Sequence, residues 1–386
     1  MIENKRTVSI IIDAFDTLFF RDGRPFSMGD ETWADGFFPP PPSVVYGALR
    51  TGYFAQHIDE FTSAATDNDC TDDLVIRALF YRIIPGNNIY FPAPLDLVER
   101  TDKTNAIKQQ EANDKRYSVE LLSLIPQNGG CSSLDKGLQL LKSGNRVEPV
   151  DKGLMEIFDL KSYLNYGSQM KSGFSFKIRK SSDYICSESK IGIGRDDQTR
   201  ASGDTGKLYR VGMQRLASRG GTSRLELGVV YDNLCLPDSG ILRMGAEGKC
   251  VACRPGSMPE FDISALRQSE SRRFKLYLMT PGIFDNGWVA DWMLQGAYKG
   301  IDFELIGAAS GRSMHLGGFD MKQGKPKPMR KAVPAGSVYY FELKNGKTVG
   351  ECFDPLFEAF HFKSLAGQPS AKNKEGCGIA LLGTGA

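Results

Sequence analysis

The chain lacks the residues that several classes of protein require. Only three of its 386 residues are histidine, and its eight cysteines are scattered. The single close cysteine pair, Cys250 and Cys253, has no second pair to complete a zinc ligand set. Alternation along residues 249–254 instead predicts a strand with these cysteines on opposite faces. We therefore expect no disulfide framework, no metal and no cofactor.

Long apolar runs and an excess of one charge are also missing. No segment approaches the roughly 20 apolar residues of a membrane span, and Asp13 interrupts the short apolar core of residues 1–15. That opening predicts a first β-strand rather than a signal peptide, so we expect a cytoplasmic protein with no membrane partner. The 48 Lys and Arg are balanced by 46 Asp and Glu, which leaves a net charge of +2. A nucleic-acid site must therefore be a local stripe of cations.

Recognisable catalytic motifs are absent as well. The sequence holds no GxxxxGK[ST] loop, no GxSxG elbow, no dinucleotide fingerprint and no paired carboxylates at two-metal spacing. His57 lies where a helix is expected to end, a position that the helix dipole favours. His361 lies between two phenylalanines, a pattern typical of the core, and His315 stands in a glycine-rich basic segment that suits an RNA contact. We expect no catalytic residue.

The N-terminal segment carries the strongest positive pattern. An apolar strand runs into an Asp-Gly turn with Arg21 and Arg24 on its two sides. The prolines at 39–42 exclude helix interior and central strand there, and Ser43 is predicted to cap the helix that follows. Two arginines beside exposed helix N–H groups form an anion site, and phosphate is the usual anion. A plain hairpin turn without a ligand is the alternative.

Apolar periodicity divides the chain into two batches of short strands. Strands are predicted over residues 8–20, 74–84, 89–91, 174–179 and 224–231, and then over 273–280, 301–308, 336–343 and 378–382. Helices are predicted over 43–57 and 355–365, a long hairpin over 183–212, and loops over 100–118 and 310–331. This pattern is typical of an α+β protein rather than of a doubly wound sheet. We place a domain boundary within residues 225–270, which divides the chain into 1–235 and 236–386.

Several sequence blocks, in order, resemble those of one protein family. They are FFRDGRPF at 19–26, FPPPPSVVYGALR at 38–50, MGAEGK at 244–249 and GCGIALLG at 376–383. With them the chain resembles the RAMP-superfamily subunit of the type III-B CRISPR (Cmr) effector complex, over most of its length. Two residues depart from the family pattern, since Ala246 replaces a glycine and Cys377 replaces a bulky residue.

The resemblance implies both a fold and partners. The fold would be two ferredoxin-like, RRM-related domains, the first with an inserted hairpin and the second ending in a glycine-rich loop. The chain would be a non-catalytic, antiviral subunit that binds the 5′ handle of the guide crRNA. It would contact the large signalling subunit and the backbone RAMP subunit, and no direct DNA contact is expected.

Basic loops supply the candidate RNA-binding residues, because binding side chains collect on loops. Aromatic residues among them offer stacking surfaces for splayed bases, and terminal glycines would let backbone N–H groups approach phosphates. The candidates are Arg21, Arg24, Ser43, Arg195, Arg200, Lys207, Tyr209, Arg312, His315, Lys325, Lys327, Arg330, Lys331, Gly376 and Gly378. A solvated charged face is the alternative for the lysine runs.

Two other functions stay open on the sequence alone. One is a metal-independent endoribonuclease that uses His57 or His315 to process guide precursor. The other is a protein-only scaffold whose basic loops meet acidic partner surfaces. The hairpin tip, residues 194–206, is too polar for a core. We therefore expect it to be mobile in the free protein and to become ordered against RNA or a neighbouring subunit.

Overall fold

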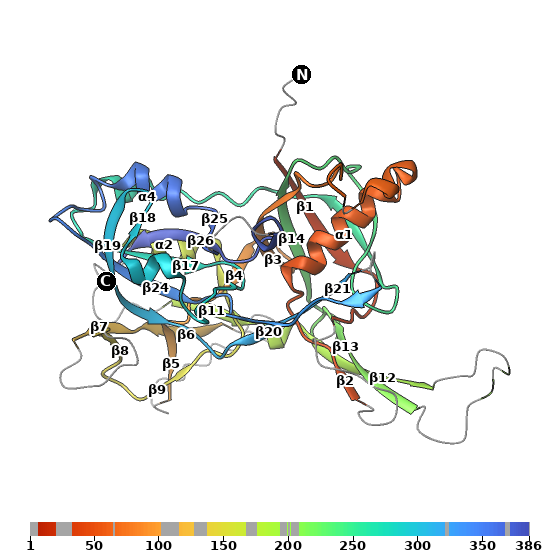
Figure 1. The fold of residues 1–386 in the computed structure, drawn as a ribbon. Coiled ribbons are helices and arrows are strands. Elements are labelled where there is room, and N and C mark those ends of the chain that lie inside the picture. Colours follow the sequence, from red (N-terminus) through yellow and green to blue (C-terminus); the bar gives the residue numbers. More distant parts are fainter. Residues whose placement is uncertain are drawn as a thin grey trace.

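Two lobes lie side by side in the structure, a computed structural model of the chain (Figure 1). The structure describes residues 7–20, 33–64, 66–101, 116–126, 137–166, 176–193, 199, 201, 208–320, 324–366 and 371–385. No helix within these ranges is long and apolar enough to cross a membrane. Antiparallel strands dominate and the helices are few, so the predicted α+β class is confirmed.

The N-terminal unit has the strand order of a ferredoxin-like domain. Its elements are β1 (Thr7–Ala14), α1 (Pro42–Phe54), β3 (Val75–Ile84), β14 (Arg224–Asp232), β15 (Gly240–Arg243) and β16 (Cys250–Pro255). The strands pair in the order β16-β1-β14-β3, and every neighbouring pair is antiparallel. The second helix of the pattern is replaced by β15, a short strand at the edge of the sheet.

Helix α1 begins at Pro42, so the prediction that Ser43 caps it is wrong. Proline suits the first helical position because its fixed φ is helical and its missing N–H would have no helical partner there. The N-cap residue is Pro41, and no side chain forms a capping hydrogen bond with the first turn of this helix. Ser43 lies half-buried in the first turn, ahead of Val45 and Leu49, which are buried against the sheet.

The C-terminal unit repeats the ferredoxin-like order with both helices present. Its elements are β17 (Arg273–Leu278), α3 (Asp291–Gln295), β19 (Ile301–Ala309), β24 (Val338–Leu343), α4 (Phe353–Phe360) and β26 (Ile379–Thr384). The strands pair in the order β26-β17-β24-β19, with β18 (Ala297–Tyr298) and β25 (Lys363–Ser364) at the two edges. The rings of Trp292 and Phe274 stack on Phe360 and join the helices to the sheet. Both predicted ferredoxin-like domains are therefore confirmed.

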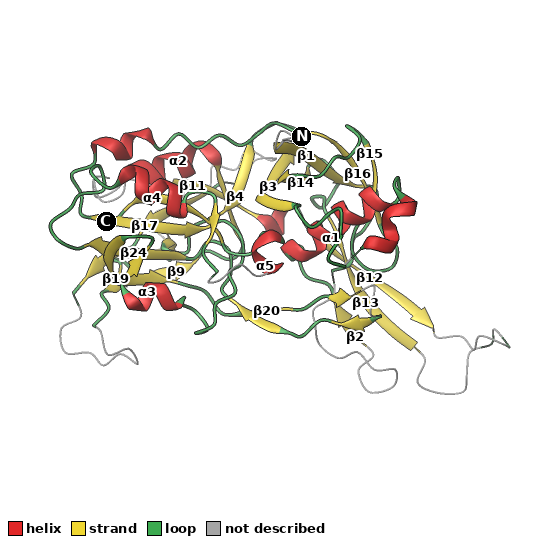
Figure 2. Cartoon of the chain, turned by 45° about the horizontal axis from the view of Figure 1, so that its top comes forward, coloured by secondary structure: helices red, strands yellow, loops and turns green. Residues whose placement is uncertain are grey.

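After β3, residues 89–180 leave the N-terminal unit and cover the C-terminal one (Figure 2). They form β4 (Ile89–Pro92), β5 (Leu97–Arg100), β6 (Tyr117–Leu121), β7 (Ser123–Ile125), β8 (Leu140–Lys142), β9 (Val147–Pro149), β10 (Gly153–Glu156), α2 (Ile157–Tyr166) and β11 (Phe176–Lys180). Strand β4 pairs with β3, so one sheet of 11 strands continues as β4-β10-β11-β6-β5-β9. Helix α2 packs on β26, and the N–H of Gln139 donates to the carbonyl of Ile306 at 2.7 Å.

The predicted boundary between residues 235 and 236 stays a prediction, and the strand pairing adds two facts to it. Strands β15 and β16 lie beyond that boundary and yet pair into the first sheet. Residues 89–180 lie before it and yet pack on the C-terminal unit. Hydrogen bonding therefore favours an end of the N-terminal unit after Pro255, inside the predicted range 225–270.

A buried polar cluster holds the middle segment to the C-terminal unit. Asp96 and Lys275 are 0% and 1% exposed. The hydroxyl of Tyr163 donates to Asp96 Oδ2 at 2.6 Å, and the hydroxyl of Tyr340 donates to the same oxygen. Lys275 Nζ lies 3.4 Å from the centre of the Tyr163 ring. Burial raises the pKa of Asp96 and lowers the pKa of Lys275 to about 8.

Two antiparallel extensions leave the lobes. The arm is the hairpin of β12 (Cys186–Ile193) and β13 (Leu208–Arg215), with β2 (Trp33–Asp35) parallel to β13. It confirms the predicted hairpin and reaches away from both lobes (Figure 1). The ribbon consists of β20 (Met314–Leu316) with β23 (Arg330–Ala332), and of β21 (Phe319–Asp320) with β22 (Lys325–Pro326). The prediction of a plain loop over 310–331 is therefore wrong. The remaining short helices are η1 (Ile58–Ser63), η4 (Ser181–Asp183), η5 (Ser264–Gln268) and α5 (Ala371–Lys374).

Candidate nucleic-acid interface

The predicted anion site at the first turn lies outside the described residues, because Arg21 and Arg24 fall in the range 21–32. The described residues on both sides of this range are held by backbone hydrogen bonds. The N–H of Phe37 donates to the carbonyl of Phe20 at 3.0 Å, and Trp33 pairs with Arg210 on β13. The role of the two arginines stays a prediction.

The turn at residues 244–249, the one that lacks a family glycine, packs directly against the chain just before residues 21–32. The N–H of Ala246 donates to the carbonyl of Phe19 at 2.9 Å. The residues with positive φ are Gly245, Glu247 and Gly248, at 87°, 62° and 63°. A Cβ on Gly245 would lie 2.7 Å from the carbonyl oxygen of Phe19, so only glycine fits there. Because position 246 has no positive φ, alanine replaces glycine there without backbone strain.

Three of the predicted arm residues, Arg195, Arg200 and Lys207, also lie outside the described residues. The fourth, Tyr209, pairs with Gly192 across the hairpin. A Cβ on Gly192 would lie 2.2 Å from the Tyr209 ring, so the ring covers the bare backbone of the opposite strand. Tyr209 also packs against a small cluster that includes Met213. One face of the ring is therefore used within the protein, and its role in RNA stacking stays a prediction.

Charge at the base of the arm is compensated by carboxylates. Arg215 binds Glu188 through two nitrogens and lies 3.0 Å from Asp16. Its hydrogen bond lowers the pKa of Glu188, which keeps that carboxylate ionised. Arg210 donates to the Ser189 hydroxyl at 2.6 Å. This part of the arm is therefore an internal network of ion pairs and hydrogen bonds.

The ribbon brings together most of the candidate RNA-binding residues between positions 312 and 331. His315 on β20 stands opposite Lys331 on β23. Five of the six candidates there are exposed: Arg312, His315, Lys325, Arg330 and Lys331. Among side chains that the structure describes, no carboxylate forms an ion pair with any of these five. In Figures 1 and 2 the ribbon runs from the C-terminal unit across to the N-terminal unit. The backbone that carries these cations therefore passes both lobes.

The sixth of these candidates, Lys327, anchors the ribbon instead of extending into solvent. Its Nζ lies 3.4 Å from Oε1 of Glu375, a carboxylate that is 5% exposed. Its N–H donates to the carbonyl of Gly318 at 2.9 Å. These two contacts tie the ribbon to the segment that precedes the C-terminal glycines. Lys327 therefore holds the ribbon in position against this segment.

The predicted approach of phosphate to Gly376 and Gly378 is contradicted by the structure. Both glycines are buried. The N–H of Gly378 donates to the carbonyl of Pro281 at 2.8 Å, and that of Gly376 to the carbonyl of Asn373 at 3.3 Å. Their positive φ values of 91° and 70° and the contact of Gly376 with Ile76 explain why glycine is needed. The glycines shape a packed turn and present no free N–H to a ligand.

The three histidines are not gathered into one site. His361 is 4% exposed, accepts the N–H of Leu382 at Nδ1, and has a pKa lowered to about 4 by burial. It is the core residue that the sequence predicted. His57 stacks on Tyr53 at 4.2 Å and bonds the carbonyl of the same residue through Nδ1. Across the described ranges, no group of three or more His, Cys, Asp or Glu side chains could hold a metal.

The structure also gathers arginines that the sequence analysis did not connect. Glu226 on β14 is 0% exposed and accepts Arg254 Nη2 at 2.7 and 2.8 Å. Arg224 and Arg82 lie 3.5 and 3.8 Å from the same carboxylate. Burial of the neighbouring Asp13 raises its pKa. The strand alternation of residues 224–232 placed Arg224 and Glu226 on one face, but the pairing with β3 and β16 could not be predicted from it.

Comparison with known proteins identifies the family of this chain but no curated relative. Residues 10–381 match the family described as CRISPR-associated protein (Cas_Cmr3). No curated protein matches the sequence. A subunit in the "Cryo-EM structure of the Type III-B Cmr-beta bound to cognate target RNA and AMPPnP, state 1" is similar at 14% identity and a TM-score of 0.45, over 86% of this chain and 86% of that one. A subunit in the "Crystal structure of Csm3-Csm4 subcomplex in the type III-A CRISPR-Cas interference complex" is similar at 10% identity and a TM-score of 0.35, over 87% of this chain and 94% of that one. Structural likeness this distant carries no argument, whereas the family match spans nearly the whole sequence: the chain belongs to the Cas_Cmr3 family of type III-B CRISPR (Cmr) complex subunits.

Proposed function

We propose that this subunit binds the 5′ handle of the crRNA and links it to the large signalling subunit, without catalysing a reaction itself. The observation that carries the proposal is the set of exposed cations on the ribbon, from Arg312 to Lys331. The backbone RAMP subunit is the other expected partner, and the complex is expected to act in the cytoplasm.

The ribbon has the physical properties of a phosphate-binding surface. Affinity for nucleic acid comes largely from cations that displace counterions along the phosphate backbone. Backbone pairing between β20 and β23 and the Lys327–Glu375 contact hold these cations in place before RNA arrives. Two prolines, Pro326 and Pro328, further limit the backbone. Less conformational entropy is therefore lost on binding than a flexible lysine-rich loop would lose.

Among the residues that the structure describes, no arrangement favours the endoribonuclease alternative. A general acid or base needs a pKa near the working pH and access to substrate. His361 is buried, and its pKa of about 4 keeps it neutral. His57 is engaged with Tyr53, and the exposed His315 stands opposite a lysine. We expect guide precursor to be bound and not cut.

The test is binding of RNA that carries the handle by the assembled complex. The Arg330→Glu/Lys331→Glu variant changes two exposed ribbon cations, and Lys347→Glu, in the exposed turn after β24, is the matched control. The ribbon variant is expected to bind more weakly, with a salt slope smaller by about one unit for each lost phosphate contact. The control should bind as the natural protein does.

Two results would contradict the proposal. Unchanged affinity and unchanged salt slope in the ribbon variant would remove the ribbon from the RNA site. Loss of a protein subunit from the variant complex, with RNA binding by the remaining subunits intact, would favour the protein-only scaffold. Subunit composition should therefore be measured on each preparation.

A further inference from the structure

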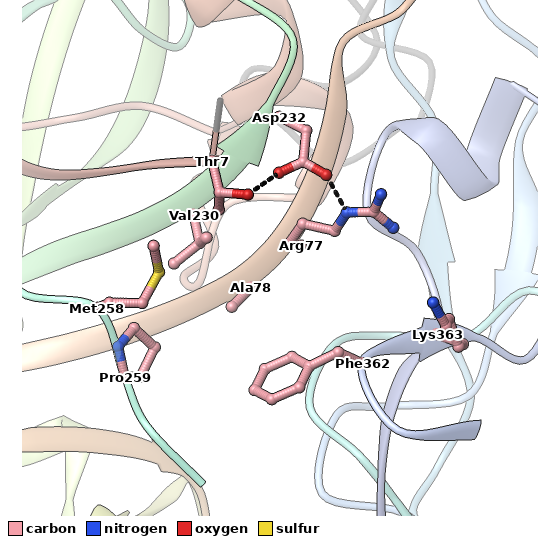
Figure 3. Close-up of a pocket in the computed structure, with 9 residues that line it drawn as sticks. All are labelled: Thr7, Arg77, Ala78, Val230, Asp232, Met258, Pro259, Phe362 and Lys363. Carbon is pink, nitrogen blue, oxygen red and sulfur yellow. Dashed lines mark hydrogen bonds and ion pairs between the residues drawn. The ribbon is translucent and has the colours of Figure 1, made fainter. Parts of the chain in front are cut away.

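A cavity of about 280 Å³ lies where the two ferredoxin-like units meet, and no residue of the ribbon lines it (Figure 3). The N-terminal unit supplies Thr7 on β1, Arg77 on β3 and Asp232 on β14. The C-terminal unit supplies Phe362 and Lys363, which follow α4. A ligand in this cavity would therefore contact both units at once.

The polar side chains of the cavity are arranged to present cations. Asp232 accepts the Thr7 hydroxyl at 2.7 Å through Oδ1 and Arg77 Nε at 2.6 Å through Oδ2. The ion pair uses Nε, so the terminal guanidinium nitrogens of Arg77 remain directed away from Asp232, as Figure 3 shows. Lys363 is exposed and adds a second cation. Because one carboxylate, Asp232, stands against two cations, Arg77 and Lys363, the cavity offers a ligand a net positive charge.

The remaining lining is apolar. Ala78 and Val230 lie on the sheet, and Met258 and Pro259 come from the connector after β16. The Phe362 ring closes the cavity from the C-terminal unit and packs edge-on against Phe261 at 5.7 Å. This lining fits an apolar side chain better than a charged or strongly hydrated group.

Phe362 is held in a backbone conformation that a bulky residue rarely adopts. Its φ is 54°, in the left-handed region, at a position after a helix where glycine is usual. Its N–H donates to the carbonyl of Ala380 at 2.9 Å, and this bond to β26 secures the conformation. Strained residues of this kind gather at binding sites, where the surrounding structure compensates their cost. Here the strain presents the ring to the cavity.

We propose that this cavity binds a segment of a neighbouring protein subunit in which an apolar side chain stands next to a carboxylate. The apolar side chain would enter against Phe362, and the carboxylate would bind Arg77 and Lys363. The volume of about 280 Å³ lies just below the range for small-molecule sites, about 300 to 1,000 Å³, and suits one or two side chains. The polar edges of a nucleobase would lie against Ala78, Val230 and Met258 without hydrogen-bond partners, so a peptide with an apolar side chain and a carboxylate fits better. The proposal does not depend on RNA binding by the ribbon.

The experiment is photo-crosslinking in the purified effector complex, assembled with its guide RNA. A benzoylphenylalanine replaces Met258, which is 42% exposed, and in a second preparation it replaces Met329 on the ribbon side, which is 43% exposed. The Met258 probe is expected to crosslink a protein segment with Asp, Glu or a free C-terminal carboxylate within about two residues of the crosslinked site. The Met329 probe is expected to crosslink RNA. Failure at Met329 alone would contradict the RNA-binding function and leave the cavity proposal standing.

Charge variants then test the carboxylate. Lys363→Glu is expected to lower the Met258 crosslink yield about fivefold, and Lys363→Arg to preserve it. Lys347→Glu, an exposed lysine elsewhere in the C-terminal unit, should have no effect. Crosslinking of Met258 to RNA, or to nothing in an intact complex, would overturn the proposal. Protein crosslinks that survive Lys363→Glu unchanged would overturn the assignment of the carboxylate.

Discussion

Replacement of Lys275 by methionine tests the buried cluster that joins the middle segment to the C-terminal unit. The substitution keeps the length of the side chain and removes its charge beside Asp96. The Asp96 carboxylate then stays buried without this cation near it. Among the described side chains, the hydroxyls of Tyr163 and Tyr340 still donate to it. Lys275 and Asp96 attract each other through their charges without a direct ion-pair contact, so the loss should lie at or below the roughly 3 to 5 kcal/mol that breaking a buried ion pair costs. We expect the free energy of unfolding to fall by about 3 kcal/mol, because Asp96 can relieve part of the cost by taking up a proton.

The matched variants are Asp96→Asn and the double variant Asp96→Asn/Lys275→Met. The single Asp96 variant leaves a buried lysine without its carboxylate and should also cost about 3 kcal/mol. The double variant removes both charges and should cost less than either single variant, about 1 kcal/mol. Urea denaturation followed by fluorescence of the buried Trp292 measures all three. Additive losses in the double variant would refute the coupling.

The pH dependence supplies an independent check of the same reasoning. Lys275 titrates near pH 8 in the folded protein and near 10.5 when unfolded. Between these values the unfolded state binds more protons, so this group makes stability rise with pH. The natural protein should therefore gain stability relative to Lys275→Met between about pH 8 and about pH 9.5, below the range in which tyrosines titrate. A difference between the two proteins that stays constant over this range would show that Lys275 is not held at a lowered pKa.

Three further predictions concern RNA. Arg21→Ala with Arg24→Ala should weaken guide binding and reduce the salt slope by about one unit per lost contact, whereas unchanged binding would make that turn purely structural. The isolated chain should not cut guide precursor in EDTA, and cleavage that His315→Ala abolishes would restore the nuclease hypothesis. Hydrogen exchange in the arm strands, 186–193 and 208–215, should slow when the complex assembles. Equal protection in the free protein would mean that the arm is already held by its own fold, and protection that follows protein partners but not RNA would move it to a protein interface.

Elements with a strong local pattern could be predicted from the sequence. The strands of both ferredoxin-like units, the hairpin of the arm and the helix after the four prolines all have a hydrophobic period that depends on neighbouring residues alone. Helix α2 was missed although its signal was present, since Leu160, Tyr163 and Leu164 recur at helical spacing and are all buried. The cap at Ser43 was wrong because proline at the first helical position outweighed the usual preference for a serine cap.

The same distinction between local pattern and long-range contact applies to the candidate site. The sequence identified the cations of the ribbon, because their density and the surrounding glycines and prolines are local features. It could not show that Lys327 would pair with Glu375, or that the N–H groups of Gly376 and Gly378 would be used in a packed turn. Each of these outcomes depends on which distant residue lies opposite, and composition contains no such information.

By itself, the sequence determined the α+β class, the family and the approximate positions of most strands, because these follow from periodicity and from motifs that are continuous along the sequence. Only the tertiary structure decided that residues 89–180 would cover the C-terminal unit, that Glu226 would hold arginines from three strands, and that Arg77 and Phe362 would face one cavity. Sheet partners are chosen by burial of whole faces and by long-range hydrogen bonds, and both depend on the packing of the entire protein.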